Sequence, residues 1–579
     1  MGRRLDWLTG IAVGATVLVV AIPAPATASV SRVRVSSDPF SGPATGTHAT
    51  EVEPDSFAAG ATILAAFQVG RFSDGGAANI GWARSTDRGA TWTHDELPGL
   101  TVAGGGAHAR ATDPAVAYDA YHHVWLVNST ALGPSPGIRG EAVVVNRSED
   151  GGATWDNPVN VAIAGAGQDF DKNWIACDET PTSPHYGNCY VEWDDYGNGG
   201  TLLLSTSKDG GQTWGAPTPT AGNDAGLGGQ PVVRPNGTVI VPYSSSNETK
   251  ISAFRSADGG TTWSAPVDIA AVAHHTPAGP MRAGALASAE INREGRVFVA
   301  WEDCGFRAGC AANDIVFTSS TDGVSWSPVR RVPIDAATSG VDHFVPGLAV
   351  DRSTGGRSTH LGLAYHYIPN RNCGAADCLL HVGFVDSLDG GATWSRPQDL
   401  AGPMRPNWLA STPDGYMTGD YISTSFSGGD PHPLIAIARA PSGGTLHEAI
   451  YSTSPALLGP RLEARRLTKL RIRPFRFRAR PSGPSIARVR GALVSYRASA
   501  AGTTRFRIQR ARIRHGSRVW RKVPGRFRRT DAAGRNVFRF TGRLHGTLRP
   551  GLYRLIVEPR DAGRPRGEAT SARFRIVRK

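Results

Sequence analysis

The sequence predicts an all-β protein in two parts, an array of small repeated sheets followed by a small β-sandwich. Three observations support this prediction: a short pattern that recurs before about residue 450, short apolar runs between its copies, and a sharp change of charge near residue 460. The first two define the array, and the third separates it from the sandwich.

The recurring pattern is Ser-x-Asp-x-Gly-x-Thr-Trp. Its Asp can accept hydrogen bonds from backbone N–H groups two or three residues further on, and its Gly allows a positive φ, so each copy is expected to form a tight hairpin turn. The Trp then returns to the sheet as an apolar anchor. Such recurrence indicates an array of sheet units. The copies are Ser85–Trp92, Ser148–Trp155, Ser207–Trp214, Ser256–Trp263, Ser387–Trp394 and a shortened one, Ser320–Trp326.

This pattern resembles the Asp-box of sialidase-type β-propellers, and the resemblance covers roughly residues 31–453. It implies a propeller of six or seven blades whose boxes lie on the rim, away from the active site. The Asp residues of the boxes are therefore interpreted as structural: Asp87, Asp150, Asp209, Asp258, Asp322 and Asp389.

The apolar runs favour seven blades. A seventh set of strand-like runs lies between Gly419 and Ser452, but it has no box and no fourth strand. The segment Ser31–Ser37 is expected to supply that strand and close the ring, because closure removes free sheet edges.

The N-terminus has the pattern of a signal peptide over residues 1–28. Arg3 and Arg4 precede the apolar stretch Leu8–Ile22, and Ala26-Thr27-Ala28 offers a cleavage site. The stretch is short for a membrane span. We therefore expect a secreted protein, extracellular or associated with the cell wall.

The cysteines support export. They fall into three pairs of near neighbours, and an even set in an exported chain favours local disulfides over a zinc site. The expected pairs are Cys177 with Cys189, Cys304 with Cys310, and Cys373 with Cys378. No metal site is predicted from them.

Charge divides the chain. Residues 461–579 contain 35 Lys and Arg against 5 Asp and Glu, whereas the first 460 residues contain 27 against 44. We place a linker at 454–464 and an Arg-rich module at 465–579. In this module apolar residues and arginines alternate, as in a β-sandwich with a cationic outer face.

The Arg-rich module resembles the immunoglobulin-like modules of secreted actinobacterial proteins. A surface of this kind could bind an anionic polymer of the cell envelope in a salt-dependent way, with no specific nucleic acid as partner. The alternative is genomic composition, because the chain has 56 Arg and only 6 Lys. We expect a monomer.

Candidate site residues come from the starts of the innermost strands, which converge at the mouth of a propeller channel. A glycan or glycoconjugate is the expected ligand. For each residue the alternative is a turn cap, a buried ion pair or packing. The candidates are Asp113, Asp171, Asp420 and Tyr421 for catalysis, and Lys172, Asp342 and His343 for binding. Their carboxylates are also suitable ligands for Ca²⁺; no other cofactor is predicted.

The sialidase resemblance adds further candidates. Sialidases hold the sugar carboxylate with three arginines, protonate with an aspartate and attack with a tyrosine activated by a glutamate. The place of the first arginine reads Glu53-Pro54-Asp55, which would repel a sialate carboxylate. The next family segment carries over to Arg71, with Asp74 nearby as candidate acid. For the other two arginines the candidates are Arg110, Arg282 and Arg439, and no motif selects among them. For the nucleophile and its activating glutamate the candidates are Glu290, Glu302, Tyr365 and Tyr421, again without a motif that selects among them.

Three classes of function follow. The first is a secreted sialidase-like glycoside hydrolase or lyase, the second a non-catalytic propeller that binds carbohydrate or protein at the cell envelope, and the third a scaffold anchored by the Arg-rich module. Two channel carboxylates with separated pKa values would favour the first.

Overall fold

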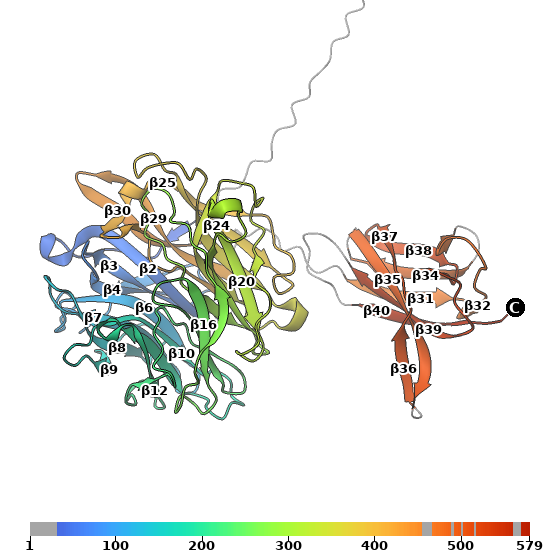
Figure 1. Ribbon diagram of the computed structural model, residues 1–579, viewed down its shortest axis with the longest axis horizontal. Coiled ribbons are helices and arrows are strands. Elements are labelled where there is room, and N and C mark those ends of the chain that lie inside the picture. Colours follow the sequence, from blue (N-terminus) through green and yellow to red (C-terminus); the bar gives the residue numbers. More distant parts are fainter. Residues whose placement is uncertain are drawn as a thin grey trace, which may run out of the picture.

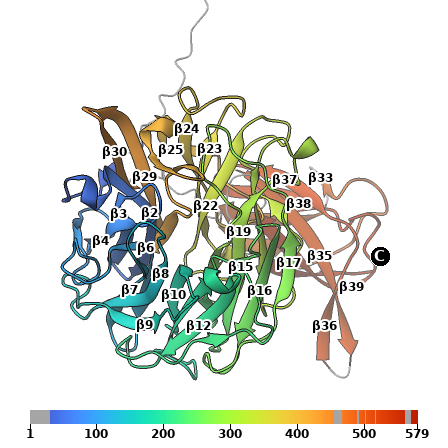
Figure 2. The same ribbon diagram turned by 60° about the vertical axis from the view of Figure 1, so that its left-hand side comes forward.

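The computed structural model describes residues 30, 32–453, 466–487, 491–499, 502–514, 517–559 and 569–578. The predicted signal peptide and linker lie outside these residues. The described part is nearly all β, with a β-propeller over residues 32–453 and a β-sandwich over residues 466–578 (Figures 1 and 2). None of its helices is long and apolar enough for a membrane span.

The strands of the propeller pair into antiparallel units of four. Each of the first three units follows the chain order from the innermost strand to the outermost. They are β2 (Thr47–Ala59), β3 (Thr62–Arg71), β4 (Ala77–Ser85) and β5 (Thr93–Glu96); β6 (Arg110–Asp119), β7 (Val124–Leu132), β8 (Gly140–Ser148) and β9 (Val159–Ile163); and β10 (Phe170–Cys177), β11 (Cys189–Asp195), β12 (Thr201–Ser207) and β13 (Thr218–Pro219).

The next three units repeat this order. They are β14 (Val232–Val233), β15 (Val239–Ser244), β16 (Lys250–Ser256) and β17 (Val267–Ala271); β18 (Ser288–Ile291), β19 (Val297–Asp303), β20 (Asp314–Ser320) and β21 (Arg330–Arg331); and β22 (Asp342–Val350), β23 (Leu361–Ile368), β24 (Leu380–Ser387) and β25 (Gln398–Met404).

The last unit joins the two ends of the propeller sequence. It consists of β28 (Ser423–Ser427), β29 (Asp430–Ser442), β30 (Thr445–Thr453) and β1 (Arg32–Arg34). The N-terminal strand β1 pairs antiparallel with β30, with Arg32 opposite Thr453. The segment expected to supply the missing strand does so, and the strand pairing gives seven units.

A two-stranded hairpin interrupts the repeat before the last unit. It is formed by β26 (Ala410–Thr412) and β27 (Gly415–Met417). Five single 3-10 turns lie in loops: η1 (Pro43–Thr45), η2 (Tyr196–Asn198), η3 (Ala308–Cys310), η4 (Gly356–Ser358) and η5 (Pro406–Trp408).

The sandwich packs two sheets over one apolar core. The first sheet contains β31 (Leu467–Arg473), β34 (Ala492–Ala498), β38 (Gly534–Phe540) and β33 (Ile486–Ala487). The second contains β32 (Arg476–Phe477), β40 (Thr570–Ile576), β39 (Gly551–Pro559), β35 (Gly502–Arg514), β36 (Ser517–Lys522) and β37 (Phe527–Asp531).

Each Asp-box forms the expected turn. In the second unit, Asp150 accepts hydrogen bonds from the hydroxyl of Ser148 at 2.9 Å, and from the N–H and hydroxyl of Thr154 at 2.9 and 2.7 Å. The backbone N–H of Gly152 donates to Ser148 Oγ at 2.9 Å. These bonds hold the pKa of Asp150 below its ordinary value. The box therefore stabilises a turn at the end of two strands.

The Asp150→Ala substitution should lower the free energy of unfolding by about 1–2 kcal/mol, because it removes the acceptor for several backbone and hydroxyl donors. Denaturant titration of the full chain measures this loss. The control is Glu149→Ala, whose side chain is exposed and binds Arg147 at the surface. Equal effects of the two substitutions would contradict the structural role of the box.

The three disulfides join the predicted pairs: Cys177 with Cys189, Cys304 with Cys310, and Cys373 with Cys378. Each closes a short loop of the propeller, with sequence separations of 12, 6 and 5 residues. They fix local loop geometry in the unfolded and folded chain alike.

Candidate functional site

Four innermost strands of the propeller contain an irregularity near their starts. The register shifts in β2, β6, β10 and β22, and each shift contains one residue in the left-handed region. These are Glu53 (φ 53°), Asp113 (φ 51°), Lys172 (φ 47°) and Val345 (φ 48°). Left-handed residues other than glycine cost free energy and gather at functional sites. Three of the four carry a charge, and they meet in the channel.

Lys172 is the centre of this charged cluster. Its Nζ atom lies 3.0 Å from Asp113 Oδ1, 2.5 Å from Asp420 Oδ2 and 4.0 Å from Glu53 Oε1. All four side chains are at least nine-tenths buried. Although burial alone would lower it, the three carboxylates raise the pKa of Lys172 well above its ordinary value, so this amine stays charged.

Arg282 completes the cluster from an irregular loop. It holds Asp420 with two parallel bonds, Nε to Oδ1 at 2.7 Å and Nη2 to Oδ2 at 2.6 Å. Burial opposes ionisation of Asp420, but the charges of Lys172 and Arg282 together hold its pKa far below the ordinary value. Asp420 is therefore a fixed negative charge.

Glu53 faces the same cluster. Its Oε1 atom accepts the backbone N–H of Asp420 at 3.0 Å, and its Oε2 atom accepts the side-chain amide of Gln68. Burial raises the pKa of Glu53 to about 7 against the opposing charge of Lys172. The carboxyl group of Glu53 also interacts electrostatically with Arg71. The Arg71 guanidinium donates hydrogen bonds to Gly76 O at 2.7 Å and to Met417 Sδ at 3.4 Å. Burial lowers the pKa of Arg71.

Cavities lie along the channel on both sides of this cluster. The larger one, about 690 Å³, is the mouth, and the opposite one is about 320 Å³. Between them only about 20 Å³ is free, beside Lys172, Trp174, Leu286 and Tyr421. The channel is therefore constricted at the level of the charged cluster, and the mouth is a closed-ended pocket of a size suited to a small-molecule ligand.

Two aspartates of the third unit line the mouth. Burial raises the pKa of Asp171 to about 6, and the negative charge of Asp113 adds to the shift. Burial also raises the pKa of Asp194 well above its ordinary value, and its Oδ1 atom has no hydrogen-bond partner within the described structure. Beside the ionised Asp420, the mouth thus contains a carboxyl group, that of Asp171, with a pKa raised to about 6.

One aromatic side chain stands at the rim of the mouth. Tyr196 on η2 is 73% exposed, which is unusual for so large a ring. The opposite rim consists of the loop 272–287 and the β26–β27 hairpin, which carries Asp414. Loop and hairpin are joined by backbone bonds from Arg282 N to Tyr416 O and from Tyr416 N to Pro280 O, at 2.8 and 2.9 Å.

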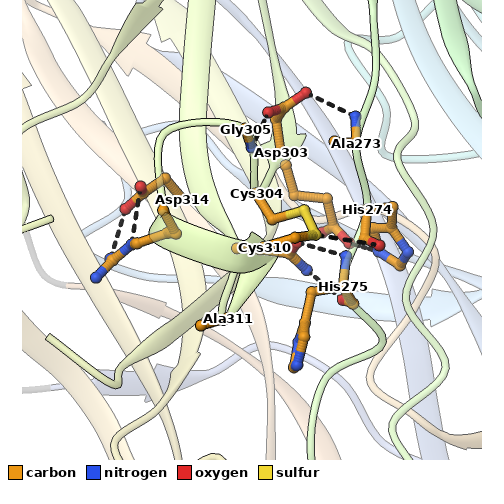
Figure 3. The surroundings of a disulfide bond; sticks show 12 residues. Ala273, His274, His275, Asp303, Cys304, Gly305, Cys310, Ala311 and Asp314 are labelled. Carbon is orange, nitrogen blue, oxygen red and sulfur yellow. Dashed lines mark hydrogen bonds and ion pairs between the residues drawn. A yellow bond between two sulfur atoms is a disulfide. The ribbon is translucent and has the colours of Figure 1, made fainter. Parts of the chain in front are cut away.

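The loop that carries Arg282 is fixed beside the Cys304–Cys310 disulfide (Figure 3). His274 Nε2 lies 2.6 Å from Glu302 Oε1, and His275 Nδ1 lies 3.0 Å from Asp342 Oδ2. Burial opposes protonation, but the bond to Glu302 raises the pKa of His274. These contacts position the loop from which Arg282 reaches Asp420.

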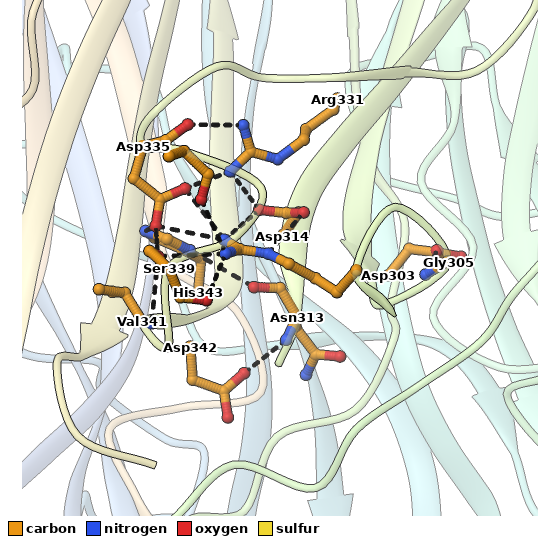
Figure 4. A network of polar contacts seen from close by, with 12 residues as sticks. Asp303, Gly305, Asn313, Asp314, Arg331, Asp335, Ser339, Val341, Asp342 and His343 are labelled. Carbon is orange, nitrogen blue, oxygen red and sulfur yellow. Dashed lines mark hydrogen bonds and ion pairs between the residues drawn. The ribbon is translucent and has the colours of Figure 1, made fainter. Parts of the chain in front are cut away.

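Asp342 and His343 were expected to join the channel cluster, but the structure places them in a second polar network (Figure 4). Asp342 binds His275 and accepts the backbone N–H of Asn313 at 2.7 Å. His343 is buried, and desolvation lowers its pKa to about 4. Asp342 and His343 lie at the start of β22, as Asp171 and Lys172 lie near the start of β10, but Asp342 contacts His275 and Asn313 and not the channel cluster.

The second network contains Asp314, Asp335 and His343, whose ligand atoms lie within 4.8 Å of one another. The two carboxylates are already paired with arginines, since Arg307 Nη2 lies 2.5 Å from Asp314 Oδ1 and 2.9 Å from Asp335 Oδ1. Arg331 Nη2 lies 2.7 Å from Asp314 Oδ1. This is a buried ion network of the fold. In the channel, Asp113 and Asp420 bind cationic side chains in the same way, and calcium binding there stays a prediction.

The remaining predicted residues lie around the cluster in different ways. Tyr421 donates its hydroxyl to Pro114 O at 3.0 Å and packs edge-on against Trp174 at 5.0 Å, so it is bonded to a carbonyl and not to a carboxylate. Arg110 binds Asp74 at 2.6 Å and stacks on Phe72 at 3.7 Å. Neither Arg110 nor Asp74 lines the mouth or the constriction.

Sequence reasoning missed Asp194, Glu192 and Tyr196. Glu192 is fully buried, and burial raises its pKa well above the ordinary value. A signal was present, because the third unit reads Glu192-Trp193-Asp194-Asp195-Tyr196, an acidic and aromatic end to a buried strand.

Comparisons with known proteins give the following matches. Residues 56–271 match the model of the BNR repeat-like domain. A search among curated proteins finds no match. Similar solved structures include the Hadza microbial sialidase Hz136 (15% identity, 70% of this chain and 66% of that chain, TM-score 0.38) and NanB sialidase from Streptococcus pneumoniae (13%, 73% and 70%, 0.38). Another is the α-L-arabinanase of Penicillium chrysogenum (13%, 73% and 99%, 0.38).

Proposed function

We propose that this protein, whose residues 56–271 match the model of the BNR repeat-like domain, is a glycoside hydrolase that acts on a neutral glycan in the mouth of its propeller channel. The observation that carries the proposal is the separation of carboxyl groups there. Asp171 has a pKa raised to about 6, and Asp420 is held ionised by Lys172 and Arg282. Paired carboxyl groups with separated pKa values are the acid and the charge stabiliser of glycoside hydrolysis.

In this mechanism Asp171 donates its proton to the glycosidic oxygen as the bond breaks. Positive charge then develops on the sugar ring, and the fixed negative charge of Asp420 stabilises it. Water adds to the anomeric carbon and gives its proton to the Asp171 carboxylate, which restores the acid. The ion pairs to Lys172 and Arg282 keep Asp420 ionised and in place throughout. Tyr196 is suited to contact the apolar face of a sugar ring at the rim.

A neutral glycan is favoured because the cations of the cluster are already paired. Lys172 and Arg282 both bind carboxylates, and Glu53 stands close to Arg71. An incoming sialate carboxylate would have to displace these partners and would meet Glu53 and Asp420. Sialidase activity is therefore the second candidate, supported by the nearness of Arg71 and Arg282 to one another.

A non-catalytic glycan-binding propeller is the alternative from another class. The observation in its favour concerns Tyr421, a candidate nucleophile. Its hydroxyl donates to the backbone carbonyl Pro114 O and not to a carboxylate that could activate it. The three disulfides support an oxidising, extracytoplasmic location for either function. N-terminal sequencing of the exported protein would test cleavage after Ala28.

The test is hydrolysis of a panel of 4-methylumbelliferyl glycosides by the full chain. We expect turnover of at least one neutral glycoside and none of the sialoside. Tyr196→Ala should raise KM for the accepted glycoside about tenfold, the effect of losing one aromatic contact of about 1 kcal/mol or slightly more.

The control for Tyr196→Ala is Tyr186→Ala, a partly buried tyrosine that lines neither the mouth nor the constriction. Turnover of the sialoside alone would support the second candidate. If a folded protein hydrolyses nothing but is retarded by neutral polysaccharides in affinity electrophoresis, and Tyr196→Ala abolishes that retardation, the propeller is a binding module.

A further inference from the structure

The outer face of the six-stranded sheet of the sandwich is cationic. Strand alternation sends Phe506, Ile508, Leu555, Val557 and Phe574 into the core. Their neighbours in sequence therefore face outward. The cationic residues on this outer face include Arg505, Arg507, Lys522, Arg528, Arg554, Arg573 and Arg575.

The register brings like charges directly opposite one another. Arg505 lies opposite Arg528, and Arg554 lies opposite Arg573. Like charges in such positions destabilise a sheet. Glu558 is the one carboxylate that the described strands place on this face, and Arg505 and Arg507 both bind it. The face thus retains an excess of positive charge.

A pocket of about 360 Å³ opens on this face. It is lined by Arg505, Arg507, Lys522, Gly525, Arg526 and His545. Within the described part of the chain, Lys522 and Arg526 form no ion pair with a carboxylate. The pocket is therefore a concave site with unneutralised cations, and it suits an anionic group of a ligand.

We propose that this outer face binds an acidic polysaccharide, with one carboxylate or sulfate group held in the pocket of Lys522 and Arg526. Neighbouring anionic groups of the same polymer lie along Arg528, Arg554 and Arg573. The inference is independent of the function proposed for the propeller.

A polysaccharide is favoured over a nucleic acid by the composition of the pocket. Proteins that bind single strands stack bases on exposed aromatic rings, and no Phe, Tyr or Trp lines this pocket. The nearby ring of Trp520 is covered by the guanidinium of Arg554 at 4.8 Å. The site offers charge without a stacking platform.

The test uses the full chain on columns of polygalacturonate, dextran sulfate and duplex DNA, eluted with a salt gradient. The variant is K522Q/R526Q/R528Q, and the charge-matched control is R139Q/K208Q/R357Q, three exposed positions of the propeller. We expect retention of the wild type on one or both polysaccharides, and the two columns distinguish carboxylate from sulfate as the bound group.

For the K522Q/R526Q/R528Q variant, the slope of log K against log salt should fall by about 2, since each cation removed contributes about 0.7 on a flexible polyanion. The control should keep the wild-type slope. Unchanged binding of the variant, an equal loss in the control, or stronger retention on DNA than on either polysaccharide would each overturn the proposal. Near-UV circular dichroism of the full chain reports the folding of both variants.

Discussion

Asp171→Asn should lower kcat/KM for the accepted glycoside by about 10²–10⁴, the contribution of a positioned proton donor. The loss should be greater for a sugar leaving group than for 4-methylumbelliferone, because a phenolic oxygen departs with little need for a proton. Initial rates on both kinds of substrate measure this difference. The control is Asp156→Asn, the same chemical change at an exposed aspartate outside the cavities.

The same residue should set the alkaline limb of the pH profile. Asp171 acts in its protonated form, so the rate should fall as pH rises through about 6, the value to which burial raises its pKa. The residual activity of Asp171→Asn should lack this limb. A limb that persists unchanged in the variant would assign proton donation to another group.

Lys172→Met should lower the free energy of unfolding by about 3–5 kcal/mol, because it leaves Asp113 as an uncompensated buried charge and removes one of the two cations that bind Asp420. Guanidinium titration followed by tryptophan emission measures the loss. This signal comes mainly from the propeller, because Trp520 is the single tryptophan after residue 453.

The double substitution K172M/D113N should recover part of the stability, since it removes the buried charge that Lys172→Met leaves unpaired. The exposed Lys208→Met is the control and should change the free energy of unfolding by about 0.5 kcal/mol or less. A loss under 1 kcal/mol for Lys172→Met would mean that water, not Lys172, compensates these carboxylates.

Much of the propeller could be predicted because its local signals repeat. Each Asp-box carries its own turn chemistry, and the apolar runs before it mark the strands of the same unit. The β26–β27 hairpin could not be predicted in this way. Its strands are three residues each and pair with the irregular loop 272–287, so tertiary contacts and not periodicity define them.

The contacts of the charged cluster were predicted between residues at equivalent positions of the inner strands, and those made from the loop 272–287 were not. Asp113, Lys172 and Asp420 do come together, because inner strands converge on one channel. Arg282 could not be selected, since no pattern in its loop shows that it reaches Asp420. Glu53 was interpreted only as a missing arginine, whereas the structure makes it a member of the cluster, in a backbone conformation that the sequence does not reveal.

The pairing of β1 with β30 means that the propeller is closed by the two ends of its own sequence. A chain emerging from synthesis or export presents β1 first, yet this strand has no partner until residues 451–453 have followed. The closing step therefore has the highest contact order in the domain, and such non-local pairings form late in folding. A tag fused close to Arg32 would sit at this seam and compete with ring closure, so the C-terminus is the better place for one.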